Sequence, residues 1–237
     1  EGDWNNDTME GRGKILFPSY DSYEGEFRAG QMHGRGTLNF ADGRVFIGRF
    51  NQGQIEGEGV QTFIDGSKYQ GMLRDGKPHG QGIMTFGDSQ ETFKGEFRDG
   101  EMHKGTFYFK AGDSYEGEFV NNKMHGEGVY SYINGEKYSG SFFEGQKHGQ
   151  GSMHFKNGDV YSGAWHKDQK IGKGEYVGKD GMKYSGEFSD GFIQGKGSVR
   201  YPDGSTYDGE FQTQQQEGQG KFQTPEGEVF QGSWQGN

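Results

Sequence analysis

Five histidines of this 237-residue chain recur at one repeated sequence position, and histidine is the side chain best suited to bind metals or move protons near neutral pH. They are His33, His79, His103, His125 and His148. A shared zinc ion would need several of these rings at about 2 Å from one point. If each lies on the same strand of successive hairpins, neighbouring histidines stand roughly 9.6 Å apart. We therefore expect them to pack or hydrogen-bond locally, and we expect no metal site and no catalytic centre.

Carboxylates form a second recurring column, and paired carboxylates can hydrolyse glycosidic bonds. The column contains Asp3, Glu26, Glu96, Glu118, Glu187 and Glu210, and it is interrupted by Arg49, Met72, Ser141 and Ala164. Glycoside hydrolysis requires a pocket and one carboxyl group with a raised pKa. A flat solvated face supplies neither, so we interpret the column as a means of controlling solubility and strand pairing.

Many Gly-x-Gly triplets are present, and glycine-rich loops can bind phosphate. Examples are Gly11-Arg-Gly13 and Gly57-Glu-Gly59. A phosphate loop needs a strand before the glycines and a helix N-terminus after them. No stretch of this chain has helical periodicity, so these are interpreted as structural glycines. We expect a protein that is not an enzyme, with no cofactor.

The dominant pattern is an aromatic-x-Gly-x-aromatic motif that returns about every 23 residues. Its leading residues are Tyr23, Phe46, Tyr69, Phe93, Tyr115, Tyr138, Tyr161, Tyr184, Tyr207 and Phe230. A fixed period in this range is typical of a stacked repeat array, and such arrays usually bind other molecules. We expect one array over residues 1–237, with truncated repeats at both ends and with the chain an excerpt of a longer one.

Within each repeat the periodicity is two, which indicates β-strands. Tyr115, Gly117 and Phe119 fall on one face of a strand, and the intervening residues fall on the other. A turn and a second alternating strand follow, and Asn134-Gly135 predicts a tight hairpin turn. The expected fold is all-β: a single elongated, twisted antiparallel sheet of about ten 23-residue β-hairpins. Its glycines make room for the rings on one face, and its opposite face is polar and solvated.

The repeat resembles a known family. The pattern Tyr-x-Gly-x-Trp/Phe-x-x-Gly-x-x-His-Gly-x-Gly, followed by Asp-Gly, is similar to the MORN repeat (membrane occupation and recognition nexus). The best copy is Tyr69–Gly82, and the resemblance covers essentially the whole chain. It implies a scaffold of cytoskeletal, ciliary or membrane-junction assemblies. It also leaves open a second role, as the targeting arm of an enzyme whose catalytic domain lies outside this chain, because similar arrays occur in lipid kinases and lysine methyltransferases.

Composition and charge narrow the partner classes. The chain has 47 glycines and a net charge of −10, which by themselves favour disorder, but a disordered chain has no reason to keep its aromatics in register. The excess of acidic residues argues against a nucleic-acid partner, which would require a basic face. The chain has no cysteine, which fits a reducing compartment. Together with the resemblance to the MORN repeat, the absence of cysteine predicts a cytoplasmic protein that is associated with the cytoskeleton, a cilium or a membrane.

The ring-bearing face is the strongest candidate for a partner-binding surface, because aromatic residues anchor many protein interfaces. We expect its rings to form an exposed aromatic groove for protein partners, a peptide segment or a cytoskeletal component among them. The rings can also form the core of the sheet itself, and we expect both roles: inner rings that are structural, and outer edges that are available to a partner. The candidate residues are Tyr115, Phe119, Tyr138, Phe142, Tyr161, Trp165, Tyr184 and Phe188. Open sheet edges also predict a homo-oligomer.

A lipid-binding role is the main alternative, and it depends on one locally basic stretch. Lys167, Lys170 and Lys173 lie there, together with two further lysines and three acidic residues. Each basic residue near an anionic membrane contributes about 1 kcal/mol. The net charge of this stretch is too small for firm attachment, so a membrane lipid is the less favoured partner.

Overall fold

The computed structural model describes residues 1–236, and every regular element in them is a β-strand. The predicted all-β class is confirmed. The described part of the chain contains no helix, and so none that could span a bilayer. The chain divides into two compact units, Glu1–Asn122 and Lys123–Asn237, here called unit 1 and unit 2.

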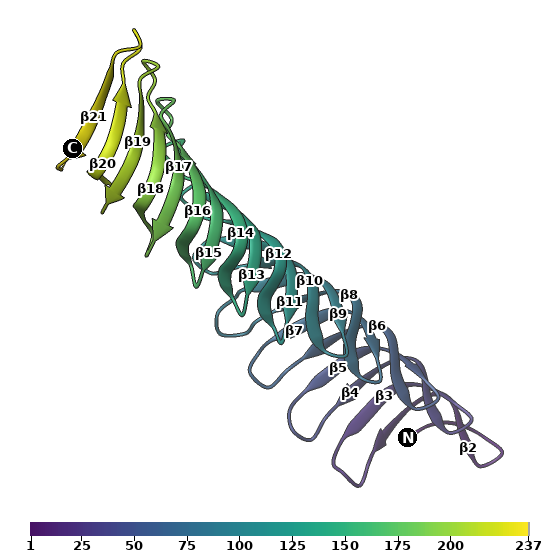
Figure 1. Cartoon of the computed structure of the whole chain (residues 1–237). Coiled ribbons are helices and arrows are strands. Elements are labelled where there is room, and N and C mark those ends of the chain that lie inside the picture. The colour runs from purple at the N-terminus through teal and green to yellow at the C-terminus, as the bar shows by residue number, and fades with distance from the viewer. Residues whose placement is uncertain (237) are drawn as a thin grey trace. The chain divides into compact units, whose positions relative to one another are not determined.

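Within each unit, every strand pairs antiparallel with the next strand in sequence (Figure 1). The strands of unit 1 are β1 (Gly2–Asn5), β2 (Thr8–Leu16), β3 (Ser22–Arg28), β4 (Gln31–Asn39), β5 (Val45–Asn51), β6 (Gln54–Thr62), β7 (Lys68–Arg74), β8 (Lys77–Thr85), β9 (Thr92–Arg98), β10 (Glu101–Tyr108) and β11 (Ser114–Val120). Those of unit 2 are β12 (Lys123–Ser131), β13 (Lys137–Phe143), β14 (Gln146–His154), β15 (Val160–His166), β16 (Gln169–Val177), β17 (Lys183–Ser189), β18 (Phe192–Arg200), β19 (Thr206–Gln212), β20 (Gln215–Gln223) and β21 (Val229–Trp234). Each repeat is thus one hairpin, as the period-two pattern predicts.

Two kinds of turn alternate along the chain. After the first strand of a repeat, a two-residue turn has both residues at positive φ, as at Ala29 (50°) and Gly30 (74°). After the second strand, five residues precede the next strand, or six between β8 and β9. The Asn134-Gly135 pair lies in such a loop, where only the glycine is left-handed and the Asn134 side chain accepts a hydrogen bond from the Glu136 amide at 3.0 Å. The hairpin turn expected at Asn134-Gly135 is present, and it is closed by the Gly135 amide, which donates to the Tyr132 carbonyl at 3.0 Å, and by the asparagine side chain.

The leading tyrosine of a repeat lies over its own glycine and over the glycine paired with it. A Cβ atom built on Gly163 would lie 2.5 Å from the Tyr161 hydroxyl, and one on Gly174 would lie 2.7 Å from the same ring. The β15–β16 register shifts after Gly163, and the Tyr161 hydroxyl donates a hydrogen bond to the Ala164 carbonyl at 3.0 Å. All seven leading tyrosines make the equivalent bond. The packing reason predicted for the glycines is confirmed.

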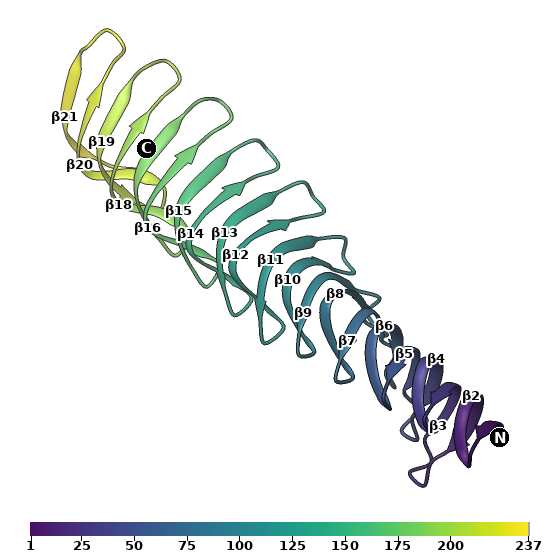
Figure 2. The same cartoon turned by 90° about the vertical axis from the view of Figure 1, so that its right-hand side faces the viewer.

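The rings also contact one another edge to face, along and between hairpins. The Tyr161 centroid lies 5.2 Å from Trp165 on its own strand and 4.8 Å from Phe188 of the next repeat. Both contacts are near perpendicular, which is the favoured geometry for aromatic pairs. In a single-layer sheet, such rings can be buried only if the sheet curves around them, and Figure 2 shows that the strands are curved. We call the ring-bearing side the inner face and the opposite side the outer face.

Successive hairpins are also joined at their turns, beyond the strand ladder. The Gly191 amide donates a hydrogen bond to the Lys170 carbonyl at 3.1 Å, and the Gln214 amide donates one to the Ile193 carbonyl at 3.0 Å. The residues that accept these bonds lie nine positions after the leading aromatic of their repeats, on the inner face. The backbone of these residues is therefore bonded both to the neighbouring strand and to the next turn, and this fixes the position of side chains such as Lys170.

Candidate functional site

The eight rings expected to form an exposed groove are buried, and none is more than 5% exposed. They form the core of the curved sheet, because each ring is covered by its glycines and by its neighbours. The expectation that they present an exposed surface is wrong: Tyr115, Phe119, Tyr138, Phe142, Tyr161, Trp165, Tyr184 and Phe188. A partner-binding role stays a prediction for Tyr184 and Phe188, which also line the groove of unit 2.

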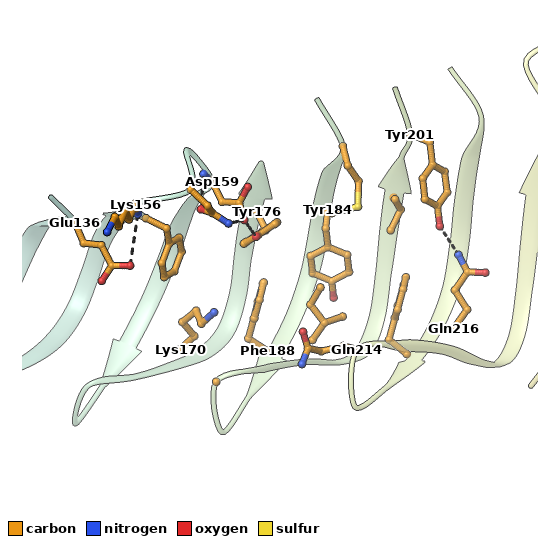
Figure 3. Close-up of a pocket in the computed structure, with 17 residues that line it drawn as sticks. Glu136, Lys156, Asp159, Lys170, Tyr176, Tyr184, Phe188, Tyr201, Gln214 and Gln216 are labelled. Atoms are coloured by element: carbon orange, nitrogen blue, oxygen red, sulfur yellow. Dashed lines mark hydrogen bonds between the residues drawn. The ribbon is translucent and has the colours of Figure 1, made fainter. Parts of the chain in front are cut away.

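That groove lies on the inner face of unit 2 and has a volume of about 910 Å³ (Figure 3). Its aromatic and aliphatic lining consists of Phe155, Tyr176, Met182, Tyr184, Phe188, Ile193, Val199, Tyr201 and Phe211. Lys170, Asp159, Gln214 and Gln216 add polar groups to it. A largely apolar cavity of this size with a few fixed polar groups is typical of a ligand-binding site.

One missing ring explains why the groove opens here. Phe155, Gly178 and Tyr201 occupy the same repeat position, because each amide donates to the carbonyl four residues later, to Asp159, Met182 and Ser205 respectively. Glycine replaces the aromatic residue only in the middle repeat of the three. The signal is present in the sequence as an absent aromatic residue before Asp180-Gly181, a departure from the repeat that the regular motif positions do not reveal.

Lys170 brings a positive charge into this aromatic groove. Its Nζ lies 5.3 Å from the Tyr161 ring centroid, 5.6 Å from that of Phe155 and 5.8 Å from that of Phe188. Burial lowers the pKa of Lys170 below its ordinary value. Within residues 1–236, no carboxylate forms an ion pair with it. Ring faces attract the cation, by about 0.5–2 kcal/mol per contact, but they leave its hydrogen-bond donors available.

The preceding repeat places a second lysine in the same way. Lys147 Nζ lies 5.3 Å from Trp165, 5.4 Å from Tyr132 and 5.6 Å from Tyr138. The equivalent residues of unit 1 are apolar: Met32, Ile55, Pro78 and Met102. At two of these repeat positions unit 2 therefore carries cations over aromatic rings, whereas at Met124 and Ile193 it keeps apolar side chains as unit 1 does.

The upper rim of the groove is fixed by hydrogen bonds between side chains (Figure 3). The Tyr176 hydroxyl donates to Asp159, whose other oxygen accepts the Lys179 amide at 2.9 Å. Burial, together with the bond to this carboxylate, raises the pKa of Tyr176 to about 12. The bond from Tyr176 is also the main reason why the pKa of Asp159 is lowered. The two residues thus form a stable pair that keeps the aromatic wall in position.

The three lysines of the lipid-binding alternative do not share a surface. Lys167 lies in a two-residue turn with φ of 49°, and Lys170 lies in the inner groove. Lys173 lies on the outer face, directly opposite Glu187 of the next strand. They do not combine into one basic patch, because the sheet separates Lys170 from Lys173.

The repeated histidines and carboxylates make local contacts. His79 Nδ1 lies 3.7 Å from Asp99 Oδ1, and the His125 ring centroid lies 5.1 Å from that of Phe143. In residues 1–236, no group of three or more histidine or acidic side chains is arranged to hold a metal ion. Several acids of the column accept backbone amides where the ladder shifts register, such as Glu26 from Arg35 at 3.1 Å. This role in strand pairing agrees with the interpretation made from the sequence.

The fold defines a class of protein, the β-hairpin repeat array, and a family model identifies it. The MORN repeat model matches ten consecutive segments: 1–22, 23–43, 46–68, 69–91, 93–114, 115–137, 138–160, 161–183, 184–206 and 207–229. The chain belongs to the MORN repeat family, as its motifs indicate. Such repeats suggest a scaffold for protein or membrane interaction. No curated protein matches the sequence.

Among solved structures, the chain resembles two centriolar domains weakly. One is the TCP domain of SAS-4 (dCPAP) from Drosophila melanogaster in complex with a proline-rich motif of Ana2, at 11% identity and a TM-score of 0.35, covering 94% of this chain and 90% of that one. The other is the G-box domain of the microcephaly protein CPAP, at 13% identity and a TM-score of 0.27, covering 95% and 100%. At these scores, neither domain informs on the function of this chain.

Proposed function

We propose that this protein is a non-catalytic scaffold that binds an extended protein segment in the inner groove of unit 2. The observation that carries the proposal is the combination of a 910 Å³ aromatic groove with Lys170, whose cation has no carboxylate partner within the described residues. Membership of a family of repeat scaffolds supports the same conclusion. We further propose action in the cytoplasm, at a cytoskeletal, ciliary or membrane-associated assembly.

The chemistry of the groove specifies the segment. Its aromatic walls favour apolar side chains, because burying them removes apolar surface from water. Lys170 favours an aspartate or glutamate of the segment, because a charge-assisted hydrogen bond in a partly desolvated site is stronger than one in water. The segment should therefore combine apolar residues with one acidic residue that reaches Lys170.

The test uses random dodecapeptides displayed on phage and selected on the full chain. Enriched sequences are synthesised, and their affinities are measured by calorimetry for the wild type and for Lys170→Glu. We expect an acidic residue in the enriched peptides and at least a tenfold loss of affinity for the variant, since a repulsive contact replaces an attractive one. Peptides that bind both proteins equally well would refute the proposal.

Lys173→Glu is the matched control, because Lys173 belongs to the same strand but lies on the outer face. It should leave the binding of these peptides unchanged. Co-sedimentation with phosphatidylserine vesicles at low salt tests the lipid alternative in parallel. Strong vesicle binding that is lost in both lysine variants would favour a membrane partner instead.

Self-association is a separate proposal, based on the open edges of the sheet. Light scattering across a range of chain concentrations measures it directly. A mass that rises with concentration supports a homo-oligomer, and a constant mass of one chain contradicts it.

A further inference from the structure

The outer face of unit 1 carries an apolar trough that the repeat itself does not require. The trough has a volume of about 830 Å³, and the backbone of Gly48, Gly59 and Gly71 forms part of its floor. Its walls combine the apolar side chains of Ile47, Val60, Met72 and Ile83 with charged ones, which are Arg35, Arg49, Lys94 and Glu58. The sequence predicts that this face is polar and solvated. The prediction fails at the four apolar positions, whereas the rest of the face keeps polar side chains, and the interruption of the acidic column by Arg49 and Met72 was the available signal.

The apolar residues are close neighbours across the sheet. Ile47 pairs with Val60, and Gln70 pairs with both Val60 and Ile83, so they form one continuous row across four strands. Ile47 is 56% exposed, Met72 43% and Ile83 37%. None of them belongs to the core, which lies on the inner face. A cluster of half-covered apolar side chains with no structural role indicates an interaction surface.

Two arginines lie beside this row, each two residues along its strand from Thr37 or Ile47, which pair with each other within the row. Arg35 and Arg49 are directly opposite each other on β4 and β5, and neither forms an ion pair within residues 1–236. Like charges in opposed positions destabilise a sheet. A carboxylate from outside could accept hydrogen bonds from both guanidinium groups and relieve that repulsion.

We propose that this trough binds an extended segment of a partner protein that carries apolar side chains along the Ile47–Ile83 row and a carboxylate between Arg35 and Arg49. The site is independent of the inner groove: it lies in unit 1, on the opposite face of the sheet, and it uses two guanidinium groups where the inner groove uses a lysine. A protein with both sites could hold two partner segments and link them.

The chemistry of the surroundings favours a narrow segment over a membrane or a second copy. Around the trough the outer face carries charges of both signs, since Glu24 forms an ion pair with Lys14 at 3.4 Å and Glu96 one with Arg98 at 2.9 Å, so it offers no continuous basic surface to a broad anionic bilayer. A segment that enters only the trough avoids these surrounding charges. The outer face of unit 2 in a second copy does not match either, because its charges already face each other, as Lys173 does Glu187 and Lys196 does Glu210.

The experiment selects displayed random dodecapeptides on the full-length Lys170→Glu chain, in which the inner groove is disabled. Enriched peptides are synthesised and titrated by fluorescence anisotropy against three further variants in that background. Ile47→Ser with Ile83→Ser introduces the side chain that unit 2 has in the same row. Arg49→Glu reverses the charge, and Ser162→Asn on the outer face of unit 2 is the control. Circular dichroism verifies that every variant is folded.

We expect peptides with alternating apolar residues and an acidic residue, and affinities that fall at least tenfold for the double serine variant and for Arg49→Glu. Replacing the acidic residue of the peptide by lysine should restore binding to Arg49→Glu, and the Ser162→Asn control should bind as the parent does. Failure to enrich any peptide that depends on Ile47 and Ile83 would overturn the proposal. So would a dimer, or binding to phosphatidylserine vesicles, that disappears in the double serine variant. All these results are independent of whether Lys170 binds a segment in the inner groove.

Discussion

Units 1 and 2 share a backbone design but differ in chemistry at particular positions of both faces. On the outer face, the repeat positions of Ile47, Val60 and Ile83 in unit 1 are mostly polar in unit 2, where Ser152 and Ser162 hydrogen-bond to each other at 2.9 Å. On the inner face, apolar residues of unit 1 correspond to Lys147 and Lys170. The fold is therefore specified by the column of rings and glycines, while the other positions are free to form different binding surfaces.

The largest expected effect tests what the two units share. Gly71→Ala in unit 1 and Gly186→Ala in unit 2 should each lower the free energy of unfolding by about 3 kcal/mol, because overpacking a filled core is costly. A Cβ on Gly71 would lie 2.6 Å from the Gly82 Cα atom, and one on Gly186 would lie 2.6 Å from the Gly197 Cα atom. Urea denaturation measures the change.

Gly232→Ala is the control for these variants, because it lies in the same column but has no atom within 4 Å of the added Cβ. It should change the stability by less than about 0.5 kcal/mol. A large effect in one unit only would show that the units do not share one packing scheme.

Tyr161→Phe should lower stability by about 1 kcal/mol at pH 8, because it removes the hydrogen bond to the Ala164 carbonyl. Burial raises the pKa of Tyr161 to about 12 from its ordinary value of 10.0. The folded state thus favours the protonated phenol, so the contribution of this shift is complete below pH 10 and is lost as the pH rises towards 12.

The difference between wild type and Tyr161→Phe should therefore shrink above pH 10, which thermal unfolding followed by circular dichroism can measure. Unit 1 has phenylalanine at two leading positions, Phe46 and Phe93, whereas four leading residues of unit 2 are tyrosine: Tyr138, Tyr161, Tyr184 and Tyr207. Alkaline pH should thus weaken unit 2 more. A difference that stays constant from pH 8 to pH 12 would contradict this account.

Lys170→Met gives unit 2 the inner-face chemistry of unit 1 at one position. It should raise the free energy of unfolding by roughly 0.5–1 kcal/mol, because it removes a partly desolvated charge that has no ion-pair partner in the described residues. Lys173→Met on the outer face should not stabilise the protein. If Lys170→Met destabilises it instead, the contacts of the lysine with the rings outweigh its desolvation.

The smallest expected effect concerns a turn. Gln214 has a φ of 71° at a position where Gly30 of unit 1 has 74°. Gln214→Gly should therefore raise stability by about 0.5 kcal/mol, because glycine adopts this conformation without strain. Gln212→Gly, within strand β19, should lower stability by a similar amount, and urea denaturation distinguishes the two.

Much of the fold could be predicted from the sequence, because the residues that determine each hairpin lie within one repeat or in the repeat next to it. The 23-residue period, the alternation within each strand and the pairing of glycines with rings depend on neighbours that the repeat makes nearly identical. The candidate site was less predictable. The inner groove depends on a single departure from the repeat, Gly178, and on the sheet curvature that brings the Lys170 side chain over the rings.

The sequence by itself determined that the chain is a β-hairpin array and that its rings and glycines share one face, because both follow from spacing. Only the tertiary structure decided that the rings are buried core, since burial depends on how far the sheet curves. Alternation along the strands already assigns Lys170 and Lys173 to opposite faces and Ile47 and Ile83 to the outer one. Only the curvature of the sheet decided that Lys170 lies among buried rings on one face while Ile47 and Ile83 stay exposed on the other.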